Sequence, residues 1–152
     1  NITELLKSDH REVSALISQL QTAGEGSASG AHTETFQKLK NSLTLHARIE
    51  EEIFYPALES FEETEDLIEQ AYEEHEEVKQ LLDEMSDLQP DDTEFQDLLA
   101  QLKYNIDDHV EEEENEVFPQ AEDLLGEETL DSMGDEMQQI KQASGTMRMS
   151  GA

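Results

Sequence analysis

The stretches His46–Glu50, which reads HARIE, and His109–Glu113, which reads HVEEE, decide how this chain folds. Each places a histidine and a glutamate four residues apart, and this spacing puts both side chains on one face of an α-helix, about 6 Å apart along its axis. Apolar residues at helical spacing extend the same face, as Leu39 and Leu43 do before His46 and Ile106 does before His109. We therefore expect both pairs to lie on the inward face of a helix.

The two stretches belong to an internal repeat with an offset of 63 residues, 109 minus 46. The aligned residues beyond them are Glu51 with Glu114, Tyr55 with Phe118, Pro56 with Pro119, and Glu59 with Glu122. Two further histidines, His10 and His75, lie in similar surroundings at residues 9–13 and 74–78, again on apolar helical faces. A duplicated pair of helices predicts a pseudo-symmetric bundle.

The spacing of apolar residues predicts four long helices. The first covers residues 3–22, the second carries residues 36–57, the third carries 68–85, and the fourth runs from 95 to near 126. A loop rich in Gly and Ser at 24–30 and turns at 60–64 and 90–92 connect them. An accessory helix over 126–144 and a disordered tail over 145–152 follow the bundle domain, residues 1–125. The expected fold is all-α: an up-down-up-down antiparallel four-helix bundle with a short C-terminal fifth helix.

Four of the histidines are expected at one level of this bundle. In antiparallel neighbours, two side chains meet when they lie equally far from the connection between their helices. The midpoints between successive histidines fall at residue 28, about residue 60 and residue 92, which are the three connections. The predicted site residues are His10, His46, Glu50, His75, His109 and Glu113.

Composition restricts the functions open to this chain. Of its 152 residues 39 are acidic and 9 are Lys or Arg, and the net charge of −30 disfavours binding to nucleic acid or an anionic membrane. The absence of cysteine excludes disulfides, thiolate metal sites and a cysteine nucleophile. No apolar run approaches the roughly 20 residues of a membrane span, and no secretory leader is recognisable, so a cytoplasmic protein is expected. The acidic runs are interpreted as solvated helix faces, with Glu50 and Glu113 as the exceptions.

Glu50 and Glu113, which we expect to be buried, need a positive partner, because an unpaired ionised carboxylate is strongly destabilising away from water. Lys79, Lys103 and Arg48 are candidate cations, but none of them explains why each glutamate follows a histidine by four residues. A metal ion explains it. Imidazole and carboxylate ligands without thiolate suit iron first, with manganese and zinc as weaker candidates, and two bridging carboxylates indicate two ions about 3.5–4 Å apart.

The Glu-x-x-His pairs of ferritin-like bundles and the His-Glu-x-x-His motif of zinc proteases are absent. Instead, the ordered set of six resembles the hemerythrin-like family, the His-His-Glu (HHE) cation-binding domains, over residues 1 to about 125. The resemblance implies a non-haem di-iron centre with an oxo or hydroxo bridge. It also implies that Glu50 and Glu113 bridge the irons, with His10 and His46 on one iron and His75 and His109 on the other.

The chain departs from the oxygen-carrying members that it resembles. Those have a second histidine four residues after the one in the third helix, where this chain has Lys79, and a longer His-to-Asp spacing in the last motif. The departure argues for a more symmetric centre and against reversible oxygen carriage. Tyr55 is either a further ligand or, as favoured here, an aromatic residue packing at the end of the bundle as Phe118 does. His32 is expected in solvent.

Three functions remain open at this point. The first is binding or sensing of oxygen, nitric oxide or iron itself. The second is an enzyme that decomposes hydrogen peroxide, like a catalase or peroxidase, and the third is metal storage. In each case the expected partner is a small molecule or ion rather than nucleic acid or a membrane.

Overall fold

The computed structural model describes residues 1–22 and 30–150. Within these ranges the chain is helical with no strand, which confirms the all-α class. The helices are α1 (Ile2–Gln21), α2 (Gly30–Ile49), η2 (Glu50–Phe54), α3 (Tyr55–Glu59), α4 (Glu62–Met85), α5 (Thr93–Glu112), η3 (Glu113–Val117), α6 (Phe118–Leu125) and α7 (Glu127–Ser150). Among the described helices, none combines the length and the apolar character that a membrane-spanning segment needs.

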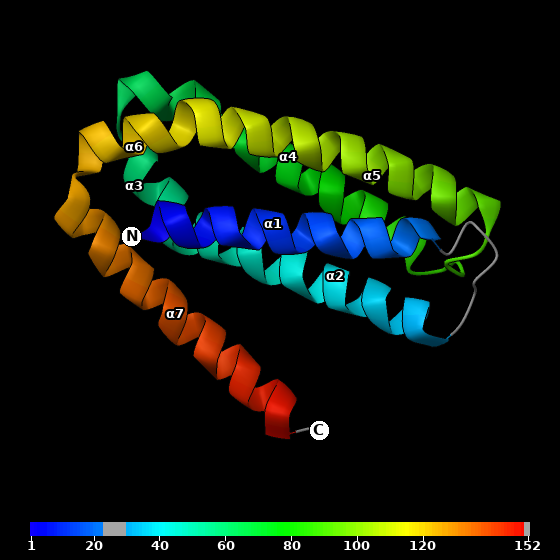
Figure 1. The fold of residues 1–152 in the computed structure, drawn as a ribbon. Helices are drawn as coiled ribbons and strands as arrows, with labels where there is room; N and C mark the ends of the chain where they lie inside the picture. Colours follow the sequence, from blue (N-terminus) through cyan, green and yellow to red (C-terminus); the bar gives the residue numbers. More distant parts are fainter. Residues whose placement is uncertain (23–29, 151–152) are drawn as a thin grey trace.

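Four antiparallel rods form the bundle (Figure 1). Two of them are α1 and α4, and the other two are composite, because α2, η2 and α3 are continuous with one another, as are α5, η3 and α6. α1 packs along α2, and α4 packs along α5, so helices joined by a connection are neighbours. This arrangement confirms the predicted up-down-up-down topology.

The apolar core consists of two clusters, one toward each end of the bundle. The cluster near the chain's N-terminus includes Leu6 and Phe54, and the other includes Val13 and Leu39. On α1 the buried His10 lies between Leu6 of the first cluster and Val13 of the second. A polar layer thus separates two apolar layers, which hold the rods at a fixed spacing on both sides of it.

Each composite rod contains a five-residue π-helical turn that begins at the same position of the repeat, Glu50 in η2 and Glu113 in η3. The N–H of Tyr55 donates to the carbonyl of Glu50, and the N–H of Phe118 donates to that of Glu113. The proline that follows in each half has no N–H with which to continue an α-helical ladder. In an α-helix, Glu50 and Tyr55 would lie about 140° apart around the axis. The wider π turn brings Tyr55 round toward the face of Glu50.

Two helices begin earlier than the sequence predicts. α2 begins at Gly30, so His32 is half-buried inside a helix rather than in a solvent-exposed loop, with its Nε2 3.3 Å from the Thr22 hydroxyl. α4 begins at Glu62, within the predicted turn, because the buried Thr64 hydroxyl donates to the carbonyl of Leu58 at 2.7 Å and closes a tighter connection. Of the predicted loop at 24–30, residues 24–29 lie outside the described residues.

The accessory helix is longer than predicted. α7 runs to Ser150, past the end at residue 144 that the sequence predicts, and the disorder expected over 145–152 stays a prediction. Residues 151–152 lie outside the described ranges, and the domain boundary near residue 125 stays a prediction. Gly126, at φ 84°, ends α6 in a conformation that favours glycine and separates it from α7.

α7 packs against the N-terminal half of α1 and then diverges from the bundle (Figure 1). Leu130 and Met137 are fully buried in this contact. Gly134 lies between them at the closest approach, where an added Cβ would be 3.2 Å from the backbone nitrogen of Ile2. The absence of a side chain here lets the two helices come together.

The variant Gly134→Leu is expected to destabilise the protein by about 1–3 kcal/mol, because the new side chain meets backbone that cannot rotate away. Urea unfolding followed by circular dichroism measures this loss. Gln138→Leu, which adds the same side chain at an exposed position of α7, is the control and is expected to change stability little. Equal stabilities for the two variants would contradict the close packing of α7.

Candidate metal centre

The structure brings all six predicted site residues together in the polar layer. The ring centroids of His10 and His46 are 5.0 Å apart, and those of His75 and His109 are 5.1 Å apart. Glu50 and Glu113 are buried between these two histidine pairs, with 0% and 1% of their surface exposed. The four histidines therefore lie at one level of the bundle, as their equal distances from the connections predict.

Each glutamate reaches one histidine of each pair. The Oε1 atom of Glu50 lies 3.2 Å from His46 Nε2 and 3.1 Å from His75 Nε2. Glu113 places Oε1 3.1 Å from His10 Nε2 and Oε2 3.4 Å from His109 Nε2. A carboxylate between two imidazole pairs has the position of a bridge.

All four histidines direct Nε2 into the centre and Nδ1 outward to a carboxylate. The distances from Nδ1 to the nearest carboxylate oxygen are 2.7 Å for His10 with Glu114, 2.9 Å for His46 with Asp9, 2.7 Å for His75 with Glu51, and 2.6 Å for His109 with Glu74. A carboxylate at this place accepts a hydrogen bond from Nδ1–H and so keeps the proton on Nδ1, which leaves the Nε2 lone pair facing inward. Carboxylate, histidine and metal in series are the usual support of a histidine ligand.

The sequence led us to interpret every acidic residue except Glu50 and Glu113 as part of a solvated helix face. That interpretation is wrong for these four carboxylates, which hold the site histidines. Asp9 and Glu74 each precede a site histidine, and Glu51 and Glu114 each follow a site glutamate. The internal repeat already aligns Asp9 with Glu74 and Glu51 with Glu114. In a chain with 39 acidic residues, however, their type alone did not distinguish them.

The nitrogen and oxygen atoms that point into the centre are better placed to bind a metal ion than to form hydrogen bonds with one another. Buried atoms that lack a hydrogen-bond partner include Nε2 of His10, His46 and His109, Oε2 of Glu50, and Oε1 of Glu113. Several lie within ion-pair distance, yet their geometry is not that of a hydrogen bond. Lone pairs that converge without donors between them are what a dication requires.

The ligand atoms fall into two groups that share Glu50. One group joins His10, His46, Glu50 and Glu113, the other joins Glu50, His75 and His109, and within each group the atoms lie within 4.8 Å of one another. Among the described residues, these are the groups of histidine and carboxylate with the spacing to hold a metal.

Without a metal, protons would balance the glutamates. Burial opposes a charge on His46, but the carboxylates of Glu50 and Asp9 outweigh it and raise the pKa of His46 to about 10. Burial likewise opposes charge on His109, and Glu113 and Glu74 raise its pKa well above the usual value. The pKa of Glu50 is held well below its usual range by His46 and His75, against the effect of burial. Metal binding must displace these protons.

The three cations considered as alternatives do not approach the buried glutamates. Arg48 pairs with Glu52 at 2.9 Å, and Lys103 pairs with Asp107 at 2.6 Å, both on exposed surfaces. Lys79 is exposed on α4. The counter-charge for the buried carboxylates is therefore a bound metal ion or, in its absence, the protonated site histidines.

Tyr55 takes part in the centre, contrary to the favoured expectation that it only packs. Its ring stacks on His75, as Phe118 stacks on His10, so the predicted equivalence of the two rings holds. Its hydroxyl, which Phe118 lacks, donates to Glu113 and lies 3.4 Å from His75 Nε2. Burial and the nearby carboxylates raise the pKa of Tyr55 well above 10, which keeps the phenol protonated. The hydroxyl makes the two halves chemically unequal.

Tyr55→Phe is expected to leave the centre able to bind metal but to weaken binding about tenfold, the scale of losing a supporting hydrogen bond to a ligand. Competition with a chelator measures the affinity. Tyr72→Phe is the control, because Tyr72 contacts the Tyr55 ring edge-on at 5.4 Å without reaching the six residues. The same affinity in both variants would refute a role for the hydroxyl.

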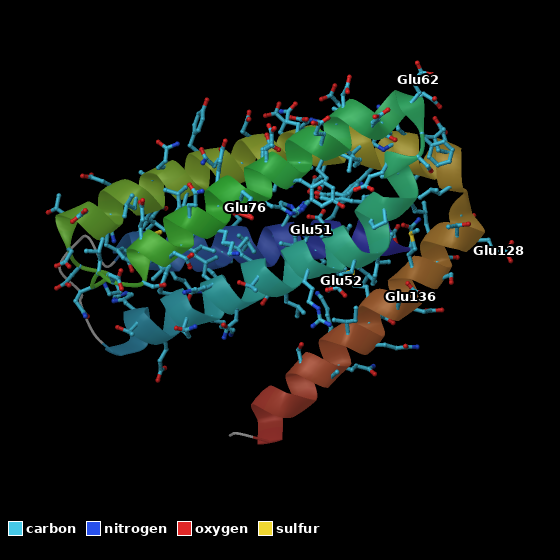
Figure 2. All side chains as sticks on the ribbon, turned by 180° about the vertical axis from the view of Figure 1, so that it is seen from behind. Glu51, Glu52, Glu62, Glu76, Glu128 and Glu136 are labelled. Atoms are coloured by element: carbon cyan, nitrogen blue, oxygen red, sulfur yellow. The ribbon has the colours of Figure 1, made fainter. Side chains whose placement is uncertain are left out.

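A cavity of about 560 Å³ opens between α2 and α4 and extends to the histidine layer. Its inner wall is apolar and includes Leu43 and Val78, and all four site histidines border it. Glu51 and Glu52 on η2 and Glu76 on α4 face this opening (Figure 2). A small molecule can therefore reach the centre from this side.

Comparison with known proteins agrees with the geometry. Residues 1–121 match the family described as the hemerythrin HHE cation binding domain. A curated protein named DNA nickase, from Nostoc sp. (strain PCC 7120), is 31% identical over 141 residues, which is 93% of this chain and 39% of the relative. The chain thus spans about two fifths of that relative's length. With six converging residues in the order that the resemblance requires, and with this match over both halves of the repeat, the chain belongs to the hemerythrin HHE cation-binding domain family.

Proposed function

We propose that the chain is a non-haem di-iron protein that binds or senses a small ligand such as oxygen or nitric oxide. One iron is held by His10 and His46 and the other by His75 and His109. The observation that carries the proposal is the position of Glu50 and Glu113, each of which reaches one histidine of either pair. Two carboxylates in this position suit two ions rather than one.

The chain's own residues prepare the centre for a ligand. The outward carboxylates fix the orientation and tautomer of the imidazoles, so little reorganisation is needed when metal binds. The cavity between α2 and α4 admits a diatomic ligand to the histidine layer, and apolar side chains form part of its wall. Bound iron would supply electrons to such a ligand.

Decomposition of hydrogen peroxide is the second candidate, favoured by the Tyr55 hydroxyl. A buried phenol that donates to Glu113 places a hydrogen-bond donor next to the ligand atoms, where it can orient a peroxide oxygen. Metal storage has less support, because the ligand atoms form two groups rather than a lining for many ions.

Metal analysis combined with absorption spectra in both redox states separates these functions. A reversible band formed when the anaerobically reduced protein meets oxygen or nitric oxide supports ligand binding, and irreversible oxidation refutes oxygen carriage. Oxygen evolution from peroxide that is abolished in His75→Ala supports the enzyme, whereas a rate no better than free iron refutes it. Storage predicts many ions per chain, so a ratio near two excludes it.

Nicking of DNA is not proposed for this chain. The name belongs to a relative of which the chain spans 39%. A net charge of −30 repels the phosphate backbone that a nicking protein must approach. Figure 2 shows acidic side chains such as Glu62, Glu128 and Glu136 projecting from both α4 and α7.

A further inference from the structure

α7 lies beyond residues 1–121 that match the family, yet one of its side chains contacts the support of a site histidine. Lys141 donates to Oδ1 of Asp9, and the other oxygen of Asp9 accepts from His46 Nδ1 at 2.9 Å. Asp9 is 8% exposed, whereas the Lys141 side chain is 35% exposed, so the contact lies at the edge of the protein with its carboxylate buried. Lys141, Asp9 and His46 form a continuous chain from the accessory helix to the centre.

The other half of the repeat has a neutral group in the corresponding place. Glu74, the counterpart of Asp9, accepts from His109 Nδ1 at 2.6 Å, and its second oxygen accepts from the amide of Gln70 at 3.2 Å. An ammonium group draws negative charge from a carboxylate much more strongly than an amide does. Asp9 is therefore the weaker acceptor for its histidine, and the observed distances, 2.9 Å against 2.6 Å, run in the same direction.

The strength of the Nδ1 hydrogen bond controls how well the opposite nitrogen donates to a metal, because a stronger acceptor raises the basicity of the ligand. His46 should then donate less than His109. The positive charge of Lys141 adds to this difference, because it lies on the His10 and His46 side of the centre.

We propose that Lys141 of α7 is a positioning residue that acts through Asp9 to weaken electron donation by His46, and so makes the two metal positions unequal. The inference rests on the proposed two-metal centre. Lys141 thereby lowers the affinity of the position of His10 and His46 for a divalent ion. The accessory helix thereby sets a property of the metal centre without touching a metal.

Lys141→Met tests the proposal against Lys141→Arg, which keeps the charge, and Lys103→Met, which removes a lysine from the exposed pair with Asp107. Stepwise binding of cobalt(II), a redox-stable substitute for ferrous iron, is followed by absorption. Lys141→Met is expected to tighten one of the two binding steps, that of the position of His10 and His46, about tenfold, the range for changed support of a ligand. In the iron protein the reduction potential should become more negative, because stronger donation by His46 favours the ferric over the ferrous ion. Lys141→Arg and Lys103→Met should resemble the wild type.

The direction of the change separates this role from a merely structural one. If Lys141 only holds Asp9 in place, its loss weakens binding, and that result overturns the proposal, as does an equal effect of Lys103→Met. NMR of the metal-free protein provides a second measurement: the His46 Nδ1 proton should move downfield in Lys141→Met, and no movement overturns the proposal. If the wild type binds fewer than two cobalt ions, the two-metal function fails, while the imidazole resonance still decides whether Lys141 controls the Asp9–His46 bond.

Discussion

Replacing Glu50 with glutamine is expected to reduce bound iron from two ions per chain to one at most. The carboxylate reaches His46 and His75, which belong to different histidine pairs, so its loss removes a ligand from both positions. A neutral amide also leaves the two positive ions without the charge that offsets their repulsion. Affinity for the second ion should fall more than 100-fold, beyond the range seen for residues that merely support a ligand.

Iron and protein assays after anaerobic loading and gel filtration measure the ratio. Glu52→Gln is the matched control, because it makes the same change two residues away, where the exposed carboxylate pairs with Arg48. It should retain two ions. Glu113→Gln should behave as Glu50→Gln does, since the repeat gives it the equivalent place. A Glu50→Gln protein that still holds two ions would show that the carboxylate does not bridge.

The helices and the six converging residues could be predicted from the sequence because both depend on local spacing. Apolar residues every three or four positions define the helices, and the equal distances of the histidines from their connections define the level at which they meet. The repeat supplied an internal check, since both His-x-x-x-Glu pairs predict a histidine and a glutamate on the inward face of a helix. α4 begins earlier than the sequence predicts, because the hydroxyl of Thr64 donates to the carbonyl of Leu58 and shortens the turn.

The remainder of the centre depends on features that spacing does not encode. A π turn leaves the positions of His46 and Glu50 unchanged but rotates every residue after them, so the reach of Tyr55 to Glu113 could not be derived from α-helical periodicity. The contact of Lys141 with Asp9 joins residues 132 positions apart and follows from the docking of α7 alone.

The stabilisation that metal gives this protein is expected to increase as pH rises from 6 to 9. In the metal-free protein, burial disfavours a charge on His46, but Glu50 and Asp9 raise its pKa to about 10, against an ordinary value of 6.5. A pKa raised by folding contributes stability that is fully present below about pH 6.5 and is lost as pH rises through about 10. The pKa of Glu50 is lowered by folding, so its contribution is lost only in acid.

The metal-free protein should therefore lose up to about 1.4 kcal/mol of unfolding free energy per pH unit for each such histidine between pH 7 and 9. His109, whose pKa is also raised, adds to this slope. In the loaded protein the metal replaces these protons, and proton competition weakens as pH rises, so the opposite trend is expected. The two stability curves should diverge toward alkaline pH.

Urea unfolding of loaded and chelator-treated protein at pH 6, 7, 8 and 9 measures this divergence. His46→Gln should flatten the slope of the metal-free protein, because the raised pKa disappears with the imidazole. His32→Gln is the control, since His32 lies in the same helix, α2, but outside the six residues, and it should keep the slope. Parallel curves for loaded and metal-free protein would mean that protons do not occupy the centre in place of metal, and the buried glutamates would then need a different counter-charge.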